Sequence, residues 1–327
     1  MSTGFKTATV ASADVPATQT NFPVYIDLSR LGITTQAEAD SVRVYANSSK
    51  TTEWARDIVS VSGCHCKIPS LTSTTSIYVY WDGTSADYAV TDTYGRNAVW
   101  SDYHFVVHMT TTTPFDSTGT FTITKGDFPT TTATNVPFGD AWMDFDGIDD
   151  KLTVTGSGAT MDSLTAVSFS IWLQFDIQSG SRPFISNRSA SGGFWDFGNN
   201  ATNMFPSISD TRYIIWGGSV TNTNYLLRAV NSTSVTNNMN FLTNTTNQGI
   251  SSGGTGQWSN PNDFQIASRP LGGFFDGRMQ EARAIKARQS LDWDKTEYNN
   301  QSDEAGFWGT WSDVGGATNT TNFFLMM

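Results

Sequence analysis

The sequence predicts an all-β protein that folds as two antiparallel β-sandwiches of the jelly-roll kind. Short segments with alternating apolar and polar residues recur at intervals of roughly ten residues, separated by turn residues, which is typical of sandwiches. No long amphipathic helical pattern interrupts them. Charged residues make up only 15% of the chain, and the Thr, Ser, Asn and Gly that replace them favour strands and polar loops over helices.

Residues 1–98 are expected to form the first domain. In the segment 21–28, Phe22, Val24 and Ile26 fall on one face, because successive side chains of a strand point to opposite sides. Further strands are expected at 5–10, 41–46, 52–61, 64–68 and 77–81, and one helical turn at 36–40.

The two cysteines of the chain, Cys64 and Cys66, flank His65. Residues two apart on a strand point the same way, so both thiolates could bind one metal ion. A zinc site needs about four ligands, and the other histidines, His104 and His108, are distant in the sequence. Two partly buried free thiols on a strand are the alternative, because a disulfide between such close neighbours would be strained.

Residues 140–154 form the most recognisable pattern, two alternating segments around the dipeptide Asp146-Gly147. Asp-Gly tolerates positive φ and is a strong signal for a tight turn. Asp146, Asp149 and Asp150 crowd into this turn. No cofactor is expected, but because Ca²⁺ prefers several carboxylate oxygens, these residues are a candidate calcium site. The alternative is that the carboxylates accept hydrogen bonds from N–H groups of the turn.

Residues 99–312 are expected to form the second domain. The segment 168–175 alternates, and burial of its apolar face, which includes Phe169 and Leu173, contributes roughly 1.5 to 3 kcal/mol per side chain. Ser290 is expected to cap a short helix that is exposed on most of its sides.

The stretch from Tyr103 to Trp308 resembles the laminin-G-like, concanavalin A-like lectin/glucanase superfamily. The resemblance implies a concanavalin A-like second sandwich that binds ligands, in some relatives with calcium. Gln280 departs from the family, which often has Asp there, and residues 187–256 match no part of its pattern. The resemblance rests on His108 with Asp116-Ser117, on residues 143–150, on the segment 168–175 with Trp172, and on residues 275–301.

Residues 1–95 resemble a family of bacterial and phage domains of unassigned function that commonly precede a lectin-like domain. The family usually ends its core in a Tyr-Tyr-Gly-Asn type of turn, and Tyr80-Trp81-Asp82-Gly83 occupies that position here. The resemblance therefore implies that the two predicted domains form such a pair.

The residue pattern predicts that the protein is not an enzyme. A glucanase of this fold would need a string of the type Glu-x-Asp-x-x-Glu to place carboxyl groups on both sides of the scissile bond, and the sequence lacks it. The sequence also lacks the esterase, zinc-protease and phosphate-loop motifs. A glycoside hydrolase is kept as the third hypothesis.

Candidate carbohydrate-binding residues lie in the loop-rich middle of the second domain. Aromatic rings stack on the CH faces of sugars, and amide and guanidinium groups bond to hydroxyls. For each aromatic residue the alternative is packing in the core or in a loop. The candidates are Trp195, Tyr213, Trp216 and Trp258, with Asn187, Arg188, Asn199 and Arg212.

The net charge of −11 repels phosphate backbones, so nucleic acid is not an expected partner. No run of about 18 apolar residues occurs, so membrane insertion is not expected. The first residues lack a secretory signal pattern, which predicts either a chain used without Sec export or a signal removed beforehand.

Residues 313–327 are expected to form a tail that ends in five apolar residues, 323–327. The tail is either a strand that caps the sandwich or an anchor that inserts into a neighbouring subunit of a homo-oligomer.

The first hypothesis for function is a non-enzymatic virion-surface protein, such as a phage decoration, tail or fibre protein. It would form homo-oligomers or bind other virion proteins and contact glycans weakly. The second hypothesis is a secreted or cell-surface carbohydrate-binding module, which would be extracellular.

Overall fold

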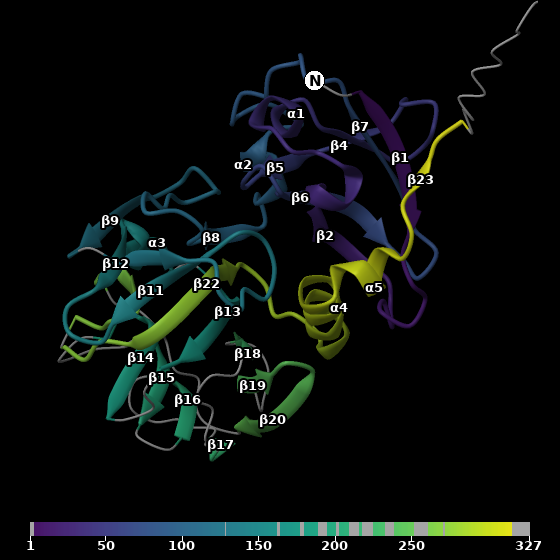
Figure 1. Cartoon of the computed structure of the whole chain (residues 1–327). Helices are drawn as coiled ribbons and strands as arrows, with labels where there is room; N and C mark the ends of the chain where they lie inside the picture. Colours follow the sequence, from purple (N-terminus) through teal and green to yellow (C-terminus); the bar gives the residue numbers. More distant parts are fainter. Residues whose placement is uncertain are drawn as a thin grey trace, which may run out of the picture.

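The computed structural model describes residues 3–127, 129–161, 164–176, 180–188, 195–200, 203–208, 216–217, 225–232, 239–251, 261–270 and 272–315. They form two β-sandwiches that pack side by side (Figure 1). Every strand pair within the four sheets is antiparallel, as in β2 with β6 and β13 with β22. The predicted all-β class is therefore confirmed.

The first sandwich places a five-stranded sheet over a three-stranded sheet. The five-stranded sheet runs β23 (Ser312–Asp313), β1 (Gly4–Thr9), β7 (Ser76–Trp81), β3 (Arg43–Tyr45) and β4 (Glu53–Trp54). The three-stranded sheet runs β2 (Gln19–Asp27), β6 (Gly63–Leu71) and β5 (Arg56–Ile58). The short helices are η1 (Leu28–Leu31), α1 (Gln36–Asp40) and α2 (Arg96–Val99).

The core of this sandwich contains the residues that alternation placed on one face. Phe22, Val24 and Ile26 of β2 are buried together with Cys64 and Cys66 of β6. The free-thiol alternative for the two cysteines is therefore what the structure shows.

The second sandwich consists of an eight-stranded and a seven-stranded sheet. The first sheet holds β10 (Thr130–Thr132), β11 (Trp142–Asp146), β22 (Asp276–Ile285), β13 (Ala166–Phe175), β18 (Tyr225–Ser232), β19 (Met239–Thr243) and β20 (Thr246–Ser251), with β8 (Tyr103–Val107) paired to β22. The second holds β17 (Trp216–Gly217), β16 (Asn203–Ile208), β15 (Trp195–Asn200), β14 (Ser181–Ser186), β21 (Phe264–Ile266), β12 (Lys151–Thr155) and β9 (Thr122–Gly126), and α3 (Ser157–Met161) follows β12.

The segment after β22 returns to the first sandwich. Helices α4 (Leu291–Ser302) and α5 (Glu304–Trp308) contact β2, and β23 then pairs with β1. The side-chain oxygen of Ser290 accepts a hydrogen bond from the N–H of Trp293, which confirms the predicted cap. The sequence pattern predicted that residues up to 312 belong to the second domain, whereas α4, α5 and β23 contact the first sandwich.

Helix α4 is not exposed on most of its sides, contrary to the sequence prediction. Trp293, Glu297 and Asn300 are buried, because the helix lies between β2 of the first sandwich and the outer face of β13. Both faces of β13 are therefore buried, and Ser168 and Trp172 lie in the interior along with Phe169.

The described helices include none that is both long and apolar enough to cross a membrane.

Candidate functional site

The first candidate site is an acidic pocket at one edge of the second sandwich. The Asp146-Gly147 turn exists as predicted, with Gly147 at φ +75°. Its two flanking strands belong to different sheets, however, so the turn bridges the layers. Beside it lies a pocket of about 470 Å³ whose lining includes seven aspartates: Asp127, Asp144, Asp146, Asp149, Asp150, Asp176 and Asp276.

Part of this acidic turn serves its own backbone. Asp146 Oδ1 accepts a hydrogen bond from the N–H of Ile148 at 2.8 Å, and Asp150 Oδ2 accepts one from the N–H of Asp146 at 3.1 Å. One carboxylate oxygen from each of Asp146, Asp149 and Asp150 nevertheless lies within 4.8 Å of the others. These hard oxygen donors suit Ca²⁺ rather than a soft transition metal.

The electrostatics of the acidic pocket are unfavourable without a cation. Partial burial raises the pKa of Asp150, and the neighbouring charges of Asp146 and Asp149 raise it further. Burial also raises the pKa of Asp276, and Asp176 adds to that rise against the opposing Arg182. Like charges at short range disfavour ionisation of one another, so a bound divalent cation would relieve this repulsion.

The second candidate site is a solvent-facing aromatic surface on the five-stranded sheet. Side chains alternate along β7, so Ile77, Val79 and Trp81 are buried whereas Tyr78 and Tyr80 are partly exposed on the outer side. The register of the sheet adds two further rings to that side. Phe5 of β1 pairs with Tyr80, and Tyr45 of β3 pairs with Tyr78. We call Phe5, Tyr45, Tyr78 and Tyr80 the aromatic face.

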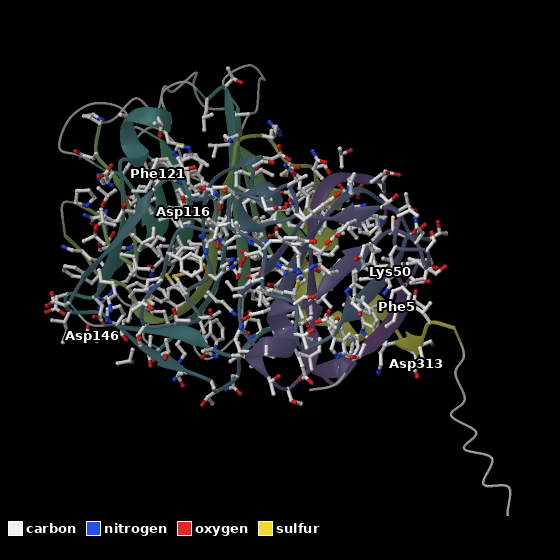
Figure 2. The ribbon with its side chains drawn as sticks, turned by 90° about the horizontal axis from the view of Figure 1, so that it is seen from above. Phe5, Lys50, Asp116, Phe121, Asp146 and Asp313 are labelled. Carbon is white, nitrogen blue, oxygen red and sulfur yellow. The ribbon has the colours of Figure 1, made fainter. Side chains whose placement is uncertain are left out.

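The aromatic face combines ring surfaces with polar groups. The ring of Phe5 lies 6.1 Å from that of Tyr80 and 6.2 Å from that of Tyr78. The ammonium group of Lys50 lies 3.3 Å from the ring centroid of Tyr80. The hydroxyls of Tyr45, Tyr78 and Tyr80 form no hydrogen bond with any residue in the described ranges. Figures 1 and 2 place this surface at the opposite end of the molecule from the turn of Asp146.

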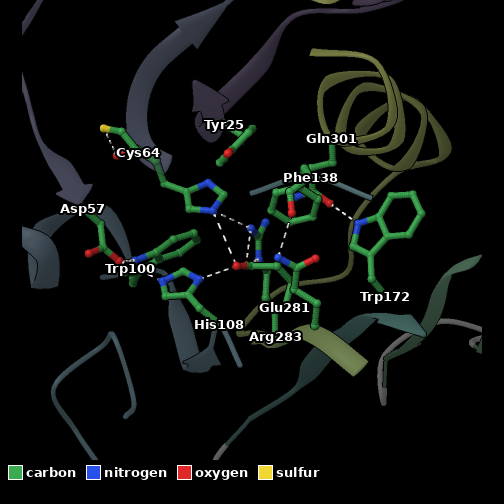
Figure 3. A network of polar contacts seen from close by, with 12 residues as sticks. Tyr25, Asp57, Cys64, Trp100, His108, Phe138, Trp172, Glu281, Arg283 and Gln301 are labelled. Atoms are coloured by element: carbon green, nitrogen blue, oxygen red, sulfur yellow. Dashed lines mark hydrogen bonds and ion pairs between the residues drawn. The ribbon is translucent and has the colours of Figure 1, made fainter. Parts of the chain in front are cut away.

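A third feature is a buried polar network where the two sandwiches meet (Figure 3). His108, just after β8, lies between Asp57 of β5 and Glu281 of β22. Its Nε2 is 2.9 Å from the Asp57 carboxylate, and its Nδ1 is 2.5 Å from the Glu281 carboxylate. Arg283 of β22 donates to Glu281 at 2.6 Å and to Glu297 of α4 at 2.9 Å. All five side chains are less than 6% exposed. We call these residues, with His65, the interdomain network.

A β-bulge in β22 directs Glu281 into the interdomain network. The pairing of β22 with β13 shifts register between Ser170 and Trp172, and Glu281 has a left-handed φ of +57°. Met279 and Ala282 both point into the sandwich core, so Glu281 is the extra residue of the bulge. A non-glycine residue in this conformation costs of order 1 to 3 kcal/mol, which the ion pairs of Glu281 offset.

The structure separates His65 from its neighbouring cysteines. Cys64 and Cys66 point into the core of the first sandwich, whereas His65 points the other way and stacks on His108 at a ring distance of 5.3 Å. Burial raises the pKa of the Cys64 thiol to about 12, and a metal needs the thiolate. Cys64 and Cys66 therefore do not share a site with His65, and the alternative of two free thiols fits the structure.

His65, His108 and Glu281 instead come within 4.8 Å of one another. The guanidinium of Arg283 lies 3.3 Å from Nε2 of His65, and a positive charge there disfavours a bound metal ion. We therefore interpret this group as part of the ion-paired interdomain network.

The sequence-predicted carbohydrate residues that the structure describes have structural roles. Trp195 is fully buried and stacks on Phe169 at 4.7 Å, so it offers no ring to a ligand. The Asn187 side chain accepts a hydrogen bond from the N–H of Trp195, and Arg188 pairs with Asp196 at 3.2 Å.

The remaining predicted carbohydrate-binding residues provide no exposed aromatic ring in the described part of the chain. Asn199 is buried in β15. Trp216 begins β17, but its side chain lies outside the description, as do Arg212, Tyr213 and Trp258 and the tail from residue 316 on.

The aromatic face is the feature that sequence reasoning missed. Its signal was present in the alternation of residues 77–81, where Tyr78 and Tyr80 occupy the side opposite Ile77 and Val79. The sequence could not show that Phe5 and Tyr45 would join them, because that depends on the strand order β1–β7–β3.

Comparisons with known proteins give a likeness of fold. No family model and no curated protein matches the chain. A botulinum neurotoxin type C structure that concerns interaction with two ganglioside molecules is 11% identical, over 63% of this chain and 52% of that one, with a TM-score of 0.49. The binding domain of botulinum neurotoxin DC in complex with rat synaptotagmin II is 11% identical over 62% and 52%, with a TM-score of 0.47.

A third structure is domain 4 of an extracellular arabinanase from Geobacillus stearothermophilus in complex with arabinotriose. It is 11% identical over 59% of this chain and 97% of that one, with a TM-score of 0.48. The chain spans about half the length of the two neurotoxin structures. At this identity the likeness concerns the β-sandwich fold alone.

Proposed function

We propose that this protein is a non-enzymatic binding module that attaches to neutral glycans through the aromatic face. The observation that carries the proposal is the set of four rings on one solvent-facing side of the five-stranded sheet, with three tyrosine hydroxyls free of partners among the described residues. Amphipathic rings offer apolar faces for the CH groups of a sugar and donors for its hydroxyls. An exposed aromatic patch of this kind is a common mark of a binding surface.

The charge of the protein supports a neutral ligand. A net charge of −11 repels anionic glycans over most of the surface. Lys50 supplies a donor directly at the aromatic face. Stacking and hydrogen bonding require no reacting group, which supports a non-enzymatic role.

Binding to an array of neutral and sialylated glycans, followed by calorimetry on the best neutral ligand, tests the proposal. Replacing Tyr80 or Tyr78 by Ala is expected to weaken binding about tenfold, equivalent to roughly 1.4 kcal/mol. Phe115→Ala is the matched control, because Phe115 is 43% exposed and lies outside the aromatic face. Equal affinity for both tyrosine variants and the wild type would remove the proposal, whereas loss of binding in all variants would point to misfolding.

We infer that the second sandwich belongs to the laminin-G-like, concanavalin A-like superfamily and the first to the domain family that precedes such lectin domains. A glycan-binding role fits an extracellular or cell-surface location. The virion location and the homo-oligomer stay predictions from the sequence, and light scattering on the purified chain tests the oligomer.

A further inference from the structure

The position of His108 defines its protonation state. Its two ring nitrogens face two carboxylates, Asp57 from the first sandwich and Glu281 from the second. A neutral imidazole has a single N–H and can donate to only one of them, whereas an imidazolium donates to both. With His108 and both carboxylates nearly inaccessible to solvent, water cannot replace a missing donor.

The charged and titratable groups around His108 come from several elements of both sandwiches. Strand β5 contributes Asp57, β6 contributes the stacked His65, and β22 contributes Glu281. Behind Glu281, Arg283 of β22 pairs with Glu297 of α4. The Asp57 carboxylate also accepts a hydrogen bond from the Trp100 indole at 2.7 Å.

We propose that the Asp57–His108–Glu281 bridge is a proton-dependent clasp that strengthens the packing of the two β-sandwiches while His108 is protonated and weakens it at alkaline pH. When the proton leaves, a nitrogen lone pair faces a buried carboxylate across 2.5 or 2.9 Å. That carboxylate keeps its other partner, Trp100 for Asp57 or Arg283 for Glu281, but it loses a charge-assisted hydrogen bond in a buried site, which is destabilising. The bridge acts beside apolar contacts between the sandwiches, in which Val106 and Ile285 pack in one cluster with Trp100.

The direction of the pH effect follows from the environment of His108. Burial by itself lowers its pKa, but the charge of Glu281 and the hydrogen bonds of both carboxylates outweigh burial and raise the pKa to about 9. A group whose pKa is higher in the folded protein contributes stability that is complete below its unfolded pKa, about 6.5 for histidine, and is lost as pH rises through the folded value. The clasp is therefore closed at neutral pH and opens near pH 9.

Differential scanning calorimetry of the full chain from pH 6 to pH 10 tests the clasp. The wild type is expected to melt in one transition at neutral pH and to separate into two, with the change centred near pH 9. His108→Gln is expected to melt in two transitions throughout. His104→Gln is the matched control, since His104 lies in β8, just before His108 in the chain, but bonds to the Ser157 carbonyl, and it should behave like the wild type.

Nuclear magnetic resonance of ¹⁵N-labelled histidine keeps the test decisive if His108→Gln does not fold. The chain has only three histidines, and His104→Gln assigns one signal. His108 is expected to titrate near pH 9 with both nitrogens protonated at neutral pH. Titration of His108 at or below pH 6.5, or a wild type that melts in the same way at pH 7 and pH 10, would overturn the proposal.

Discussion

The acidic pocket and the interdomain network both contain several carboxylates, but the carboxyl pKa shifts in opposite directions at the two sites. In the network, burial would raise the pKa of Glu281, but the charges of His108 and Arg283 hold it well below its usual range. In the acidic pocket, burial and neighbouring aspartates both raise the pKa of Asp150. The carboxylates of the network are thus paired with buried cationic side chains, whereas those of the pocket mainly face one another.

Removing the internal cation of the network is expected to have the largest effect. Arg283→Ala removes the guanidinium that pairs with both Glu281 and Glu297, and breaking such a buried pair costs about 3 to 5 kcal/mol. Urea denaturation measures this loss of unfolding free energy. Arg278→Ala is the control on the same strand, because Arg278 is 22% exposed and lies 4.0 Å from Asp144, and it should cost less than about 1 kcal/mol. Equal costs would contradict the comparison.

Supplying the external cation to the acidic pocket is expected to have the next largest effect. Calcium at roughly 100 times its Kd would stabilise the folded state by about 2.7 kcal/mol, measured as a rise in Tm that EDTA reverses. Asp150→Asn should abolish the rise. Asp313→Asn, which changes an exposed aspartate of β23 outside the pocket, should keep it. A Tm indifferent to calcium would leave the carboxylates with only their roles in the turn.

Neutralising one aspartate of the pocket is expected to have the smallest effect on the unfolding free energy. Unlike the loss of Arg283, it should stabilise the protein. The pKa of Asp276 is raised, so its contribution to stability is complete below its unfolded pKa and is lost as pH rises. Asp276→Asn should therefore stabilise the calcium-free protein at neutral pH, by no more than about 0.5 kcal/mol, because solvent screens partly exposed charges. Thermal melts at pH 7 and below pH 4 should show the gain only at the higher pH.

Local sequence patterns predicted much of the fold, because strand faces, turns and helix starts depend on residues that are neighbours in the chain. Alternation located the buried faces of β2 and β13, Asp146-Gly147 located the turn, and Ser290 located the start of α4. The carbohydrate prediction at Trp195 failed, because alternation alone cannot tell a loop platform from a strand of the core. The burial of α4 was missed because the surface that covers it comes from β2, more than two hundred residues earlier in the chain.

The sequence by itself determined two antiparallel sandwiches and an acidic turn, since strand alternation and turn chemistry are properties of neighbouring residues. Only the tertiary structure decided that seven aspartates share a pocket, that four rings share one solvent face, and that His108 lies between carboxylates of both sandwiches. These groupings depend on strand order, on one β-bulge and on the return of the last helices, all of which bring together side chains far apart in the sequence.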